Sequence, residues 1–223
     1  GQLVATDGKS LITRVRADRP NHFLCAPKRV EEFRLPATDD QIMVIEALDG
    51  QLITHKRYLH GTVSDGELVT DVSRDLLKIA VVNRYHDAPI AVGWIRNIGL
   101  HRGAIASCVA HDSHNIVAVG VTDTELCAAI NAVIAQRGGI SLVDGVRTVT
   151  LPLPVAGIMS DADAYDVARD YADMDRAAKE LGSPLRAPYM TLSFMALLVI
   201  PHLKMSDKGL FDGDEQRLIP IGE

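Results

Sequence analysis

The chain has 223 residues, of which 47% are apolar and 23% are charged, values that are ordinary for a globular protein. Its net charge is −6, so it has no overall basic field that would recruit nucleic acid or an acidic membrane surface. The longest apolar run, residues 194–200, falls well short of the ~20 residues that a membrane-spanning helix needs. We therefore expect no nucleic-acid partner and no membrane span.

The cysteines are few and odd in number: Cys25, Cys108 and Cys127 lie far apart along the chain. They match no disulfide framework and no C-x-x-C metal or redox motif. Because disulfides persist mainly in oxidising compartments, this cysteine usage predicts a reducing, cytoplasmic location.

The first forty residues show little sign of a packed domain. Residues 1–11, GQLVATDGKSL, predict a hairpin that turns at Asp7-Gly8. A lone strand pair has little to pack on, so we expect residues 1–20 to be the tail of a larger upstream unit. Residues 21–40 contain prolines and many charges without a sustained period, which indicates a linker. The rest, residues 41–223, is the predicted domain.

From residue 41 the pattern is dominated by hairpins. Apolar stretches separated by Asp-Gly pairs or short polar turns predict strands over residues 41–48, 51–61, 66–72, 76–85, 88–95, 103–110, 116–122, 140–145 and 146–157. The strict alternation of strand and helix that marks a doubly wound parallel sheet is missing. The expected fold class is α+β, with antiparallel β-sheets built from hairpins and flanked by two amphipathic α-helices.

The first of these helices is predicted within residues 122–139. Thr122 and Glu125 form a capping box at its start, and apolar residues at helical spacing follow as far as Ile134. Gly138 is suited to the left-handed residue that ends a helix.

The second helix is predicted over residues 161–181. Ser160 and Asp163 are placed to cap its start, and Gly182 is placed to stop it. The apolar run at residues 191–200, which ends at Pro201, is apolar all round. Its period therefore leaves helix and strand equally open.

One strand connection, within SCVAHDSHNIVAVG at residues 107–120, has an unusual composition. It places His111, Asp112, Ser113, His114 and Asn115 in a row and contains neither Gly nor Pro, which usually build such connections. Titratable side chains on a loop held by rigid strands are typical of functional sites. The alternative is a polar turn whose side chains only cap backbone groups.

A metal site is the first chemistry that these residue types suggest. His111 and His114 are spaced i, i+3, but neither H-E-x-x-H nor His-x-His occurs in the chain. Asp112, His101 and His86 are candidates for a third ligand, and nothing in the spacing singles one out. The sequence therefore predicts no metal site built from this chain alone.

A nucleophilic site is the second possibility. Ser113 and its His and Asp neighbours supply the residue types of a Ser-His-Asp triad, but triad members normally come from distant segments. No G-x-S-x-G elbow and no glycine-rich phosphate loop occurs. Cys108 lies in an apolar run, where we expect a buried and unreactive thiol. From the residues alone, the loop is a candidate site at the end of a strand pair.

The same residues carry a family resemblance. The stretch NIGLHRGAIASCVAHDSHNIVAVG, residues 97–120, closely resembles the most distinctive part of the C-terminal region of bacterial adenine deaminases. Similar stretches follow in order: RGGI (137–140), LPLPVAGIMS (151–160) and TLSFMALLVIPHLKMSDKGLFD (191–212). The resemblance covers essentially the whole chain.

One segment departs from the family pattern. VVNRYH, residues 81–86, resembles a segment that in many members has Glu and His where this chain has Asn83 and Tyr85. The departure puts in doubt any role that Glu and His have at these positions elsewhere in the family. It also leaves a different purine substrate open.

The resemblance implies hydrolytic deamination of adenine to hypoxanthine and ammonia, a step of adenine catabolism. It implies a metal-dependent amidohydrolase whose (β/α)₈ barrel lies upstream in the same polypeptide and binds Mn²⁺ or Fe²⁺, with no metal bound by this chain. Residues 1–20 then resemble the tail of the barrel and its β-sandwich. The implied partners are that barrel, adenine and further copies in a homo-oligomer, and this chain alone is expected to be inactive.

The resemblance also gives the polar loop a role at the substrate. His111 and His114 are the expected catalytic residues, which bond the purine or carry a proton. The expected substrate-binding residues are Asp112, Ser113, Asn115 and Arg84. The alternative is a non-catalytic domain for structure, oligomerisation or ligand binding, with the loop as an ordinary turn.

Overall fold

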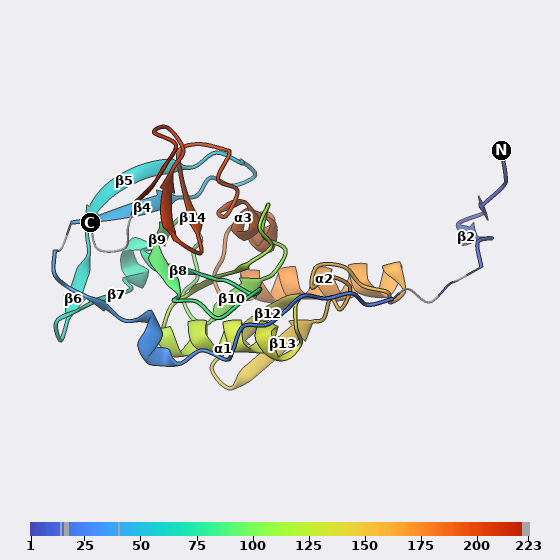
Figure 1. Cartoon of the computed structure of the whole chain (residues 1–223), viewed down its shortest axis with the longest axis horizontal. Coiled ribbons are helices and arrows are strands. Elements are labelled where there is room, and N and C mark those ends of the chain that lie inside the picture. The colour runs from blue at the N-terminus through green and yellow to red at the C-terminus, as the bar shows by residue number, and fades with distance from the viewer. Residues whose placement is uncertain (14, 16–17, 40, 220–223) are drawn as a thin grey trace.

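The structure is a computed structural model that describes residues 1–13, 15, 18–39 and 41–219. Its centre is an eight-stranded sheet in the order β13-β12-β10-β11-β8-β9-β4-β5 (Figure 1). The strands are β4 (Gln41–Glu46), β5 (His55–His60), β8 (Leu77–Val82), β9 (Ala91–Arg96), β10 (Ala104–Ser107), β11 (Ile116–Gly120), β12 (Ile140–Asp144) and β13 (Arg147–Leu151).

Neighbouring strands of the sheet are antiparallel, except that β4 runs parallel to β9. In the middle of the sheet, β10 pairs with β11 from Ala104 opposite Gly120 to Ser107 opposite Val117. On its other side β11 pairs with β8, and Ile116 lies opposite Val82. The predicted α+β class with antiparallel hairpins is confirmed.

Both faces of the central strands are covered. Helix α1 (Asp123–Ala135) packs on one face, against β10, β11 and β12. The other face carries α2 (Ala164–Glu180), α3 (Pro188–Phe194) and strands from the C-terminal sheet. Figure 1 shows α1 and α3 on opposite sides of the strands. A strand buried on both faces has no polar face, which is why β8, β10 and β11 are apolar almost throughout.

The first helix forms as its cap predicts. The Thr122 hydroxyl accepts a hydrogen bond from the Glu125 N–H at 3.1 Å, and the Glu125 carboxylate accepts one from that hydroxyl at 2.9 Å. Leu126, Ile130 and Val133 are fully buried against the sheet. The Thr122 cap and the apolar stripe are therefore confirmed, whereas the Glu125 carboxylate bonds the Thr122 hydroxyl and not the Thr122 N–H expected of a capping box.

The second helix begins three residues later than predicted. Asp163 is its N-cap and accepts from the Tyr165 N–H at 2.9 Å, so the helix starts at Ala164 and ends at Glu180. Ser160 accepts from the Ala162 N–H at 3.1 Å in a turn before the helix. The apolar run at residues 191–200, for which helix and strand were both open, contains the end of α3. This helix begins at Pro188, a residue that suits the first helical position, and ends at Phe194.

Three small sheets complete the described structure. The C-terminal one contains β14 (Leu203–Ser206), β15 (Gly209–Asp212) and β16 (Arg217–Ile219). A second one contains β3 (Leu35–Pro36), β7 (Glu67–Val69) and β6 (Thr62–Ser64), with 3-10 turns η1 (Val30–Phe33) and η2 (Val72–Arg74) nearby. The predicted N-terminal hairpin is present as β1 (Ala5–Thr6) and β2 (Lys9–Ser10), with all of residues 1–13 exposed.

Residues 18–28, which we call the leading segment, run along the surface of the domain. The Ala156 N–H donates to the Pro20 carbonyl at 2.7 Å, and the Leu24 N–H donates to the Arg84 carbonyl at 2.7 Å. The side chains of Phe23 and Cys25 are buried with those of α1. Residues 21–40 were expected to be a linker, and part of them packs into this core. The domain boundaries at residues 20 and 40 stay predictions.

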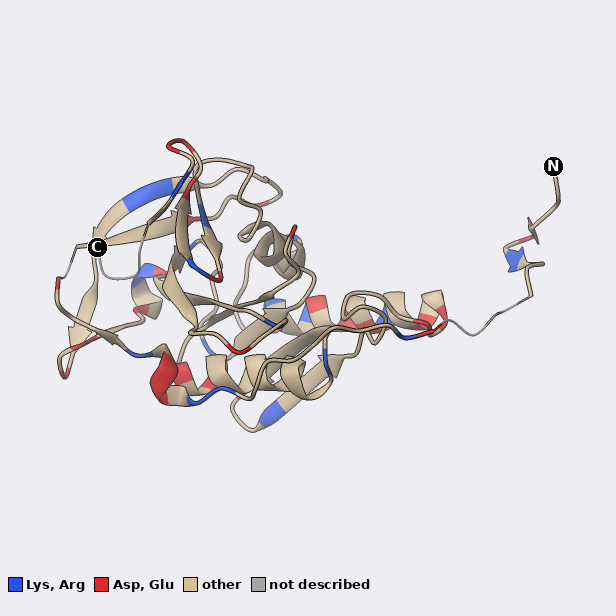
Figure 2. Cartoon of the chain, in the orientation of Figure 1, with Lys and Arg blue, Asp and Glu red and all other residues tan. Residues whose placement is uncertain are grey.

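Basic and acidic residues are interspersed along the described chain (Figure 2). On α2, for example, Arg169 pairs with Asp166 at 2.8 Å and Lys179 with Asp175 at 2.6 Å. Such pairs on one helix face are typical of a solvated surface. None of the described helices combines the length and the hydrophobicity of a membrane span.

Candidate functional site at the β10–β11 connection

The polar loop predicted from the sequence, residues 108–115, connects the buried strands β10 and β11. The His114 N–H donates to the Ala110 carbonyl at 2.7 Å and closes a turn, and His114 has a left-handed φ of 54°. Asp112 and Ser113 are exposed at the tip, His111 and His114 are half-buried, and Asn115 is buried at the base. Two rigid strands therefore present four polar side chains to a surface.

His111 is held by helix α3. Its N–H donates to the Ser193 carbonyl at 3.3 Å, and its Nδ1 lies 3.4 Å from the Ser193 hydroxyl. Its ring also packs on the Phe194 ring, with centroids 5.4 Å apart. The contact that places His111 thus comes from residues more than eighty positions away in the sequence.

His114 has the least satisfied side chain of the loop. Its Nδ1 is buried and has no hydrogen-bond partner among the described residues. Burial, then the neighbouring His111 and Arg84, lower the pKa of His114 below the ordinary histidine value. The ring is therefore neutral at pH 7, and the two histidine rings lie 6.1 Å apart. A neutral imidazole can accept a proton at one nitrogen and donate one from the other.

Asn115 and Arg84, both expected to bind substrate, lie beneath the loop. Asn115 Oδ1 accepts from the Arg84 N–H at 3.3 Å. The Arg84 side chain is only 4% exposed, and its guanidinium donates to the Ala156 carbonyl at 2.8 Å and the Tyr85 hydroxyl at 3.1 Å. The structure thus brings together all six residues predicted for the site. Four of them reach the surface of the loop, and the other two, Asn115 and Arg84, are buried beneath it.

The described residues contain no group of three or more His, Cys, Asp and Glu side chains that could hold a metal ion. His111 and His114 approach each other, but no third ligand from His101 or His86 joins them. This donor set does not fit a divalent ion, and we derive no step through a metal in this chain. Cys108 is fully buried, and burial raises the pKa of its thiol to about 12, which suits an unreactive side chain.

An apolar cavity of about 570 Å³ lies beside the loop, between β10 and the start of α2. Its lining includes Ser107, Val109, Tyr171, Tyr189 and Ser193, the last of which also contacts His111. At its rim, Met159 is 53% exposed and Met190 is 43% exposed.

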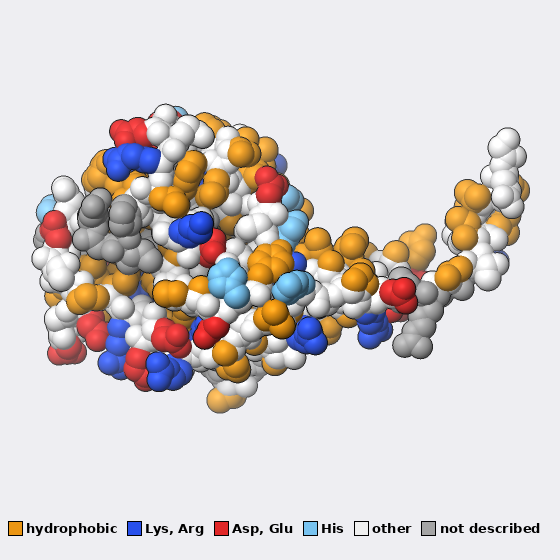
Figure 3. All heavy atoms as spheres, in the orientation of Figure 1, with side chains coloured by type: hydrophobic (Ala, Val, Ile, Leu, Met, Phe, Trp, Pro, Cys, Tyr) orange, Lys and Arg blue, Asp and Glu red, His pale blue; other side chains and the backbone are white. Residues whose placement is uncertain are grey.

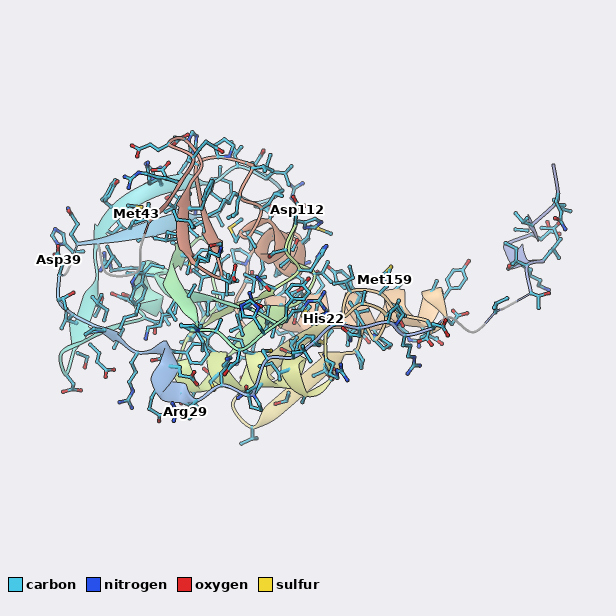
Figure 4. All side chains as sticks on the ribbon, viewed as in Figure 1. His22, Arg29, Asp39, Met43, Asp112 and Met159 are labelled. Carbon is cyan, nitrogen blue, oxygen red and sulfur yellow. The ribbon has the colours of Figure 1, made fainter. Side chains whose placement is uncertain are left out.

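The view with side chains places these features on one side of the molecule. In Figure 4, Asp112, His22 and Met159 lie on the side from which α2 projects. Figure 3 shows histidine side chains beside hydrophobic ones in the same region. The polar loop, the leading segment and the rim of the cavity therefore share one face.

Two further residues belong to this site and were given no role from the sequence. Ser193 contacts His111, and the Tyr85 hydroxyl donates to the Ser113 carbonyl at 2.7 Å. Tyr85 adjoins the predicted Arg84, and strand pairing explains its place. Continuing the β8–β11 register past Val82 opposite Ile116 sets position 85 against position 113. Ser193 has no comparable signal, because α3 was not recognised as a helix.

Comparison with known proteins gives the family. The family model described as "Adenine deaminase C-terminal domain" matches residues 51–217. Proteins named adenine deaminase from Sulfurovum sp. and Salinibacter ruber are 49% and 50% identical to the chain over 214 and 216 residues. One from Borreliella burgdorferi is 43% identical over 216 residues. Each match covers 96% of this chain but 39% of the relative, so the chain spans about two-fifths of the length of these relatives. The chain belongs to the adenine deaminase C-terminal domain family.

Proposed function

We propose that this chain is the C-terminal part of an adenine deaminase and that loop residues 111–115 face the substrate of the complete enzyme. The reaction replaces the 6-amino group of adenine by an oxygen from water and gives hypoxanthine and ammonia. The observation that carries the proposal is the half-buried pair His111 and His114, presented by two rigid strands in a chain of this family.

Each polar group of the loop has a role in this proposal. His114 is neutral at pH 7 and its Nδ1 is buried, so we assign to its other ring nitrogen, Nε2, the bond to a purine nitrogen or the transfer of a proton during ammonia loss. His111, fixed by α3, does the same from the adjacent position. Asp112 and Ser113 are exposed and offer an acceptor and a hydroxyl to the purine edge. Asn115 and Arg84 are buried, so we propose that they serve binding by holding the loop.

The rest of the machinery lies outside this chain in the proposal. The catalytic Mn²⁺ or Fe²⁺ is assigned to an upstream (β/α)₈ barrel of the same polypeptide, which is consistent with relatives that are longer than this chain. The exposed Met159 and Met190 around the loop suit contact with that barrel, because large apolar side chains grouped at a surface commonly mark an interface. A homo-oligomer and a cytoplasmic location stay predictions alongside it.

The first test compares this chain with the full-length protein. Ammonia release from adenine is measured with added Mn²⁺ or Fe²⁺. We expect turnover by the full-length protein and none by the chain alone. Turnover by the chain alone would mean that a catalytic centre lies within these residues, contrary to the proposal.

The second test addresses the loop in the full-length protein. His114→Ala should lower kcat by roughly 100-fold, the size of a general acid–base contribution. His101→Ala is the matched control, since His101 is exposed in the loop before the opposite end of β10 and should leave kcat and KM unchanged. Unchanged kcat and KM in His114→Ala would instead support the alternative of a non-catalytic domain whose loop is an ordinary turn.

A further inference from the structure

A continuous series of contacts joins the leading segment to the tip of the polar loop. It begins on the backbone, where the N–H groups of Leu24 and Cys25 donate to the Arg84 carbonyl at 2.7 and 3.3 Å. The Arg84 N–H in turn donates to Asn115 Oδ1 at the base of the loop, at 3.3 Å. Residue 84 therefore contacts the leading segment through its carbonyl and the loop through its N–H.

The Arg84 side chain makes a second set of contacts. Its guanidinium lies over the Tyr85 ring, 4.7 Å from the centroid, and within 5.8 Å of the Phe23 ring of the leading segment. Nη1 donates to the Ala156 carbonyl, and Ala156 itself donates to the Pro20 carbonyl. A buried guanidinium held by two rings and two acceptors has little freedom to move.

Tyr85 completes the series at the loop. Its hydroxyl accepts from Arg84 Nη2 at 3.1 Å and donates to the Ser113 carbonyl at 2.7 Å. Because the same hydroxyl accepts from a charged donor, its own donation to Ser113 is strengthened. Ser113 lies between the two histidines in the sequence, so this bond holds the tip of the loop, separately from the contact of His111 with α3.

We propose that Arg84 and Tyr85 are positioning residues that set the place of His111 and His114 according to the position of the leading segment. This inference rests on the proposed function for its kinetic consequences, though not for its structural ones. The leading segment packs into the core of the domain through Phe23 and Cys25, and this series of contacts, which we call the relay, connects it to the loop. The polar loop is thereby held from two sides, by Tyr85 on one and by Ser193 on the other.

The test uses Tyr85→Phe in the full-length protein, which removes the hydroxyl and keeps the ring under the guanidinium. Tyr58→Phe is the matched control, because Tyr58 is 58% exposed on the edge strand β5. Hydrogen exchange of the amides of residues 108–115 should become about five-fold faster in Tyr85→Phe, as expected for one lost hydrogen bond. It should not change in Tyr58→Phe. Equal exchange in both variants would overturn the relay.

A kinetic cycle separates positioning from general support of the fold. Tyr85→Phe should lower kcat for adenine by roughly 10-fold with little change in KM, since displaced catalytic groups slow the reaction more than binding. In a His114→Ala background the same substitution should lower kcat by clearly less than 10-fold, because one of the two histidines that it positions is gone. An equal loss of kcat from Tyr85→Phe in the unchanged protein and in His114→Ala would contradict the proposal that Tyr85 acts by positioning the loop.

The two measurements also distinguish this inference from the proposed function. If the full-length protein released no ammonia from adenine, the proposed function would be wrong, while hydrogen exchange would still decide the relay. If adenine were deaminated and exchange in residues 108–115 stayed unchanged, the relay alone would be wrong.

Discussion

Two histidines three residues apart on one loop have different surroundings. His111 packs on Phe194 and faces the Ser193 hydroxyl, whereas His114 Nδ1 is buried and has no hydrogen-bond partner among the described residues. Burial, then the charges of His111 and Arg84, lower the pKa of His114 in the folded state. Because the unfolded chain binds a proton at His114 more readily, this residue reduces stability as the pH falls below about 6.5.

This difference predicts a response to substitution of the neighbour. His111→Gln removes a charge that opposes protonation, so the pKa of His114 should rise towards the ordinary value. Titration of the His114 ring protons by NMR measures the change, with His101→Gln as the control at the far end of the sheet. A His114 pKa that did not respond to His111→Gln would show that His111 has no part in lowering it and would leave burial and Arg84 as the causes.

At the scale of single elements, the loop of residues 155–160 depends on a glycine. Gly157 has a φ of +76°, and a Cβ there would lie 2.1 Å from Arg84 Nη1. Gly66 has nearly the same φ of +78° but no atom within 4 Å of such a Cβ. The pair therefore separates backbone strain from collision with the arginine.

We expect Gly66→Ala to cost about 1 kcal/mol of unfolding free energy, the usual penalty of a left-handed φ for a residue with a side chain. Gly157→Ala should cost roughly 1–3 kcal/mol more, because the buried Arg84 side chain must leave the Ala156 carbonyl or strain the chain. Urea unfolding of both variants measures the difference. Equal losses would mean that Arg84 moves aside without cost.

The three helices also show which features of an element can be predicted from its sequence pattern. Thr122 and its apolar stripe identify α1 because cap and period are local properties. Ser160 and Asp163 both suit a cap, and only the structure shows that Ser160 closes a turn before the helix. Helix α3 is mostly buried and its exposed residue Met190 is apolar, so it lacks the charged face that would have identified it.

For the candidate site, too, local features could be predicted from the sequence and contacts between distant segments could not. The five polar residues of the loop and their place between two strands were predictable, because composition and hairpin pattern are local. The contacts of Tyr85 with Ser113 and of Ser193 with His111 were not, since they depend on the pairing of β8 with β11 and on the packing of α3. Family resemblance gave an expected substrate class, which stays a proposal, and no geometry.

At the scale of the whole molecule, the face around the loop has exposed apolar side chains that suit burial against the upstream part. Met159→Glu should leave the unfolding free energy of this chain unchanged, since Met159 is 53% exposed here. In the full-length protein the same substitution should cost roughly 1–3 kcal/mol, because the new carboxylate would be desolvated at an interface.

The control for this prediction is Val146→Glu, in the fully exposed β12–β13 turn. It should be neutral in both the chain and the full-length protein. Thermal or urea unfolding of the two variants, each in the chain and in the full-length protein, provides the comparison. A Met159→Glu effect of equal size in both proteins would place this side chain outside any interface.

The leading segment bears on how this polypeptide can be divided. The matched family region begins at residue 51, yet Phe23, Cys25 and Phe33 lie in the core beneath α1. A domain cut at residue 41 would lose these side chains, bare the apolar residues that they cover and leave Arg84 without its backbone partner at Leu24. The core of the domain therefore extends upstream of the region that the family model matches, into residues whose composition is that of a linker.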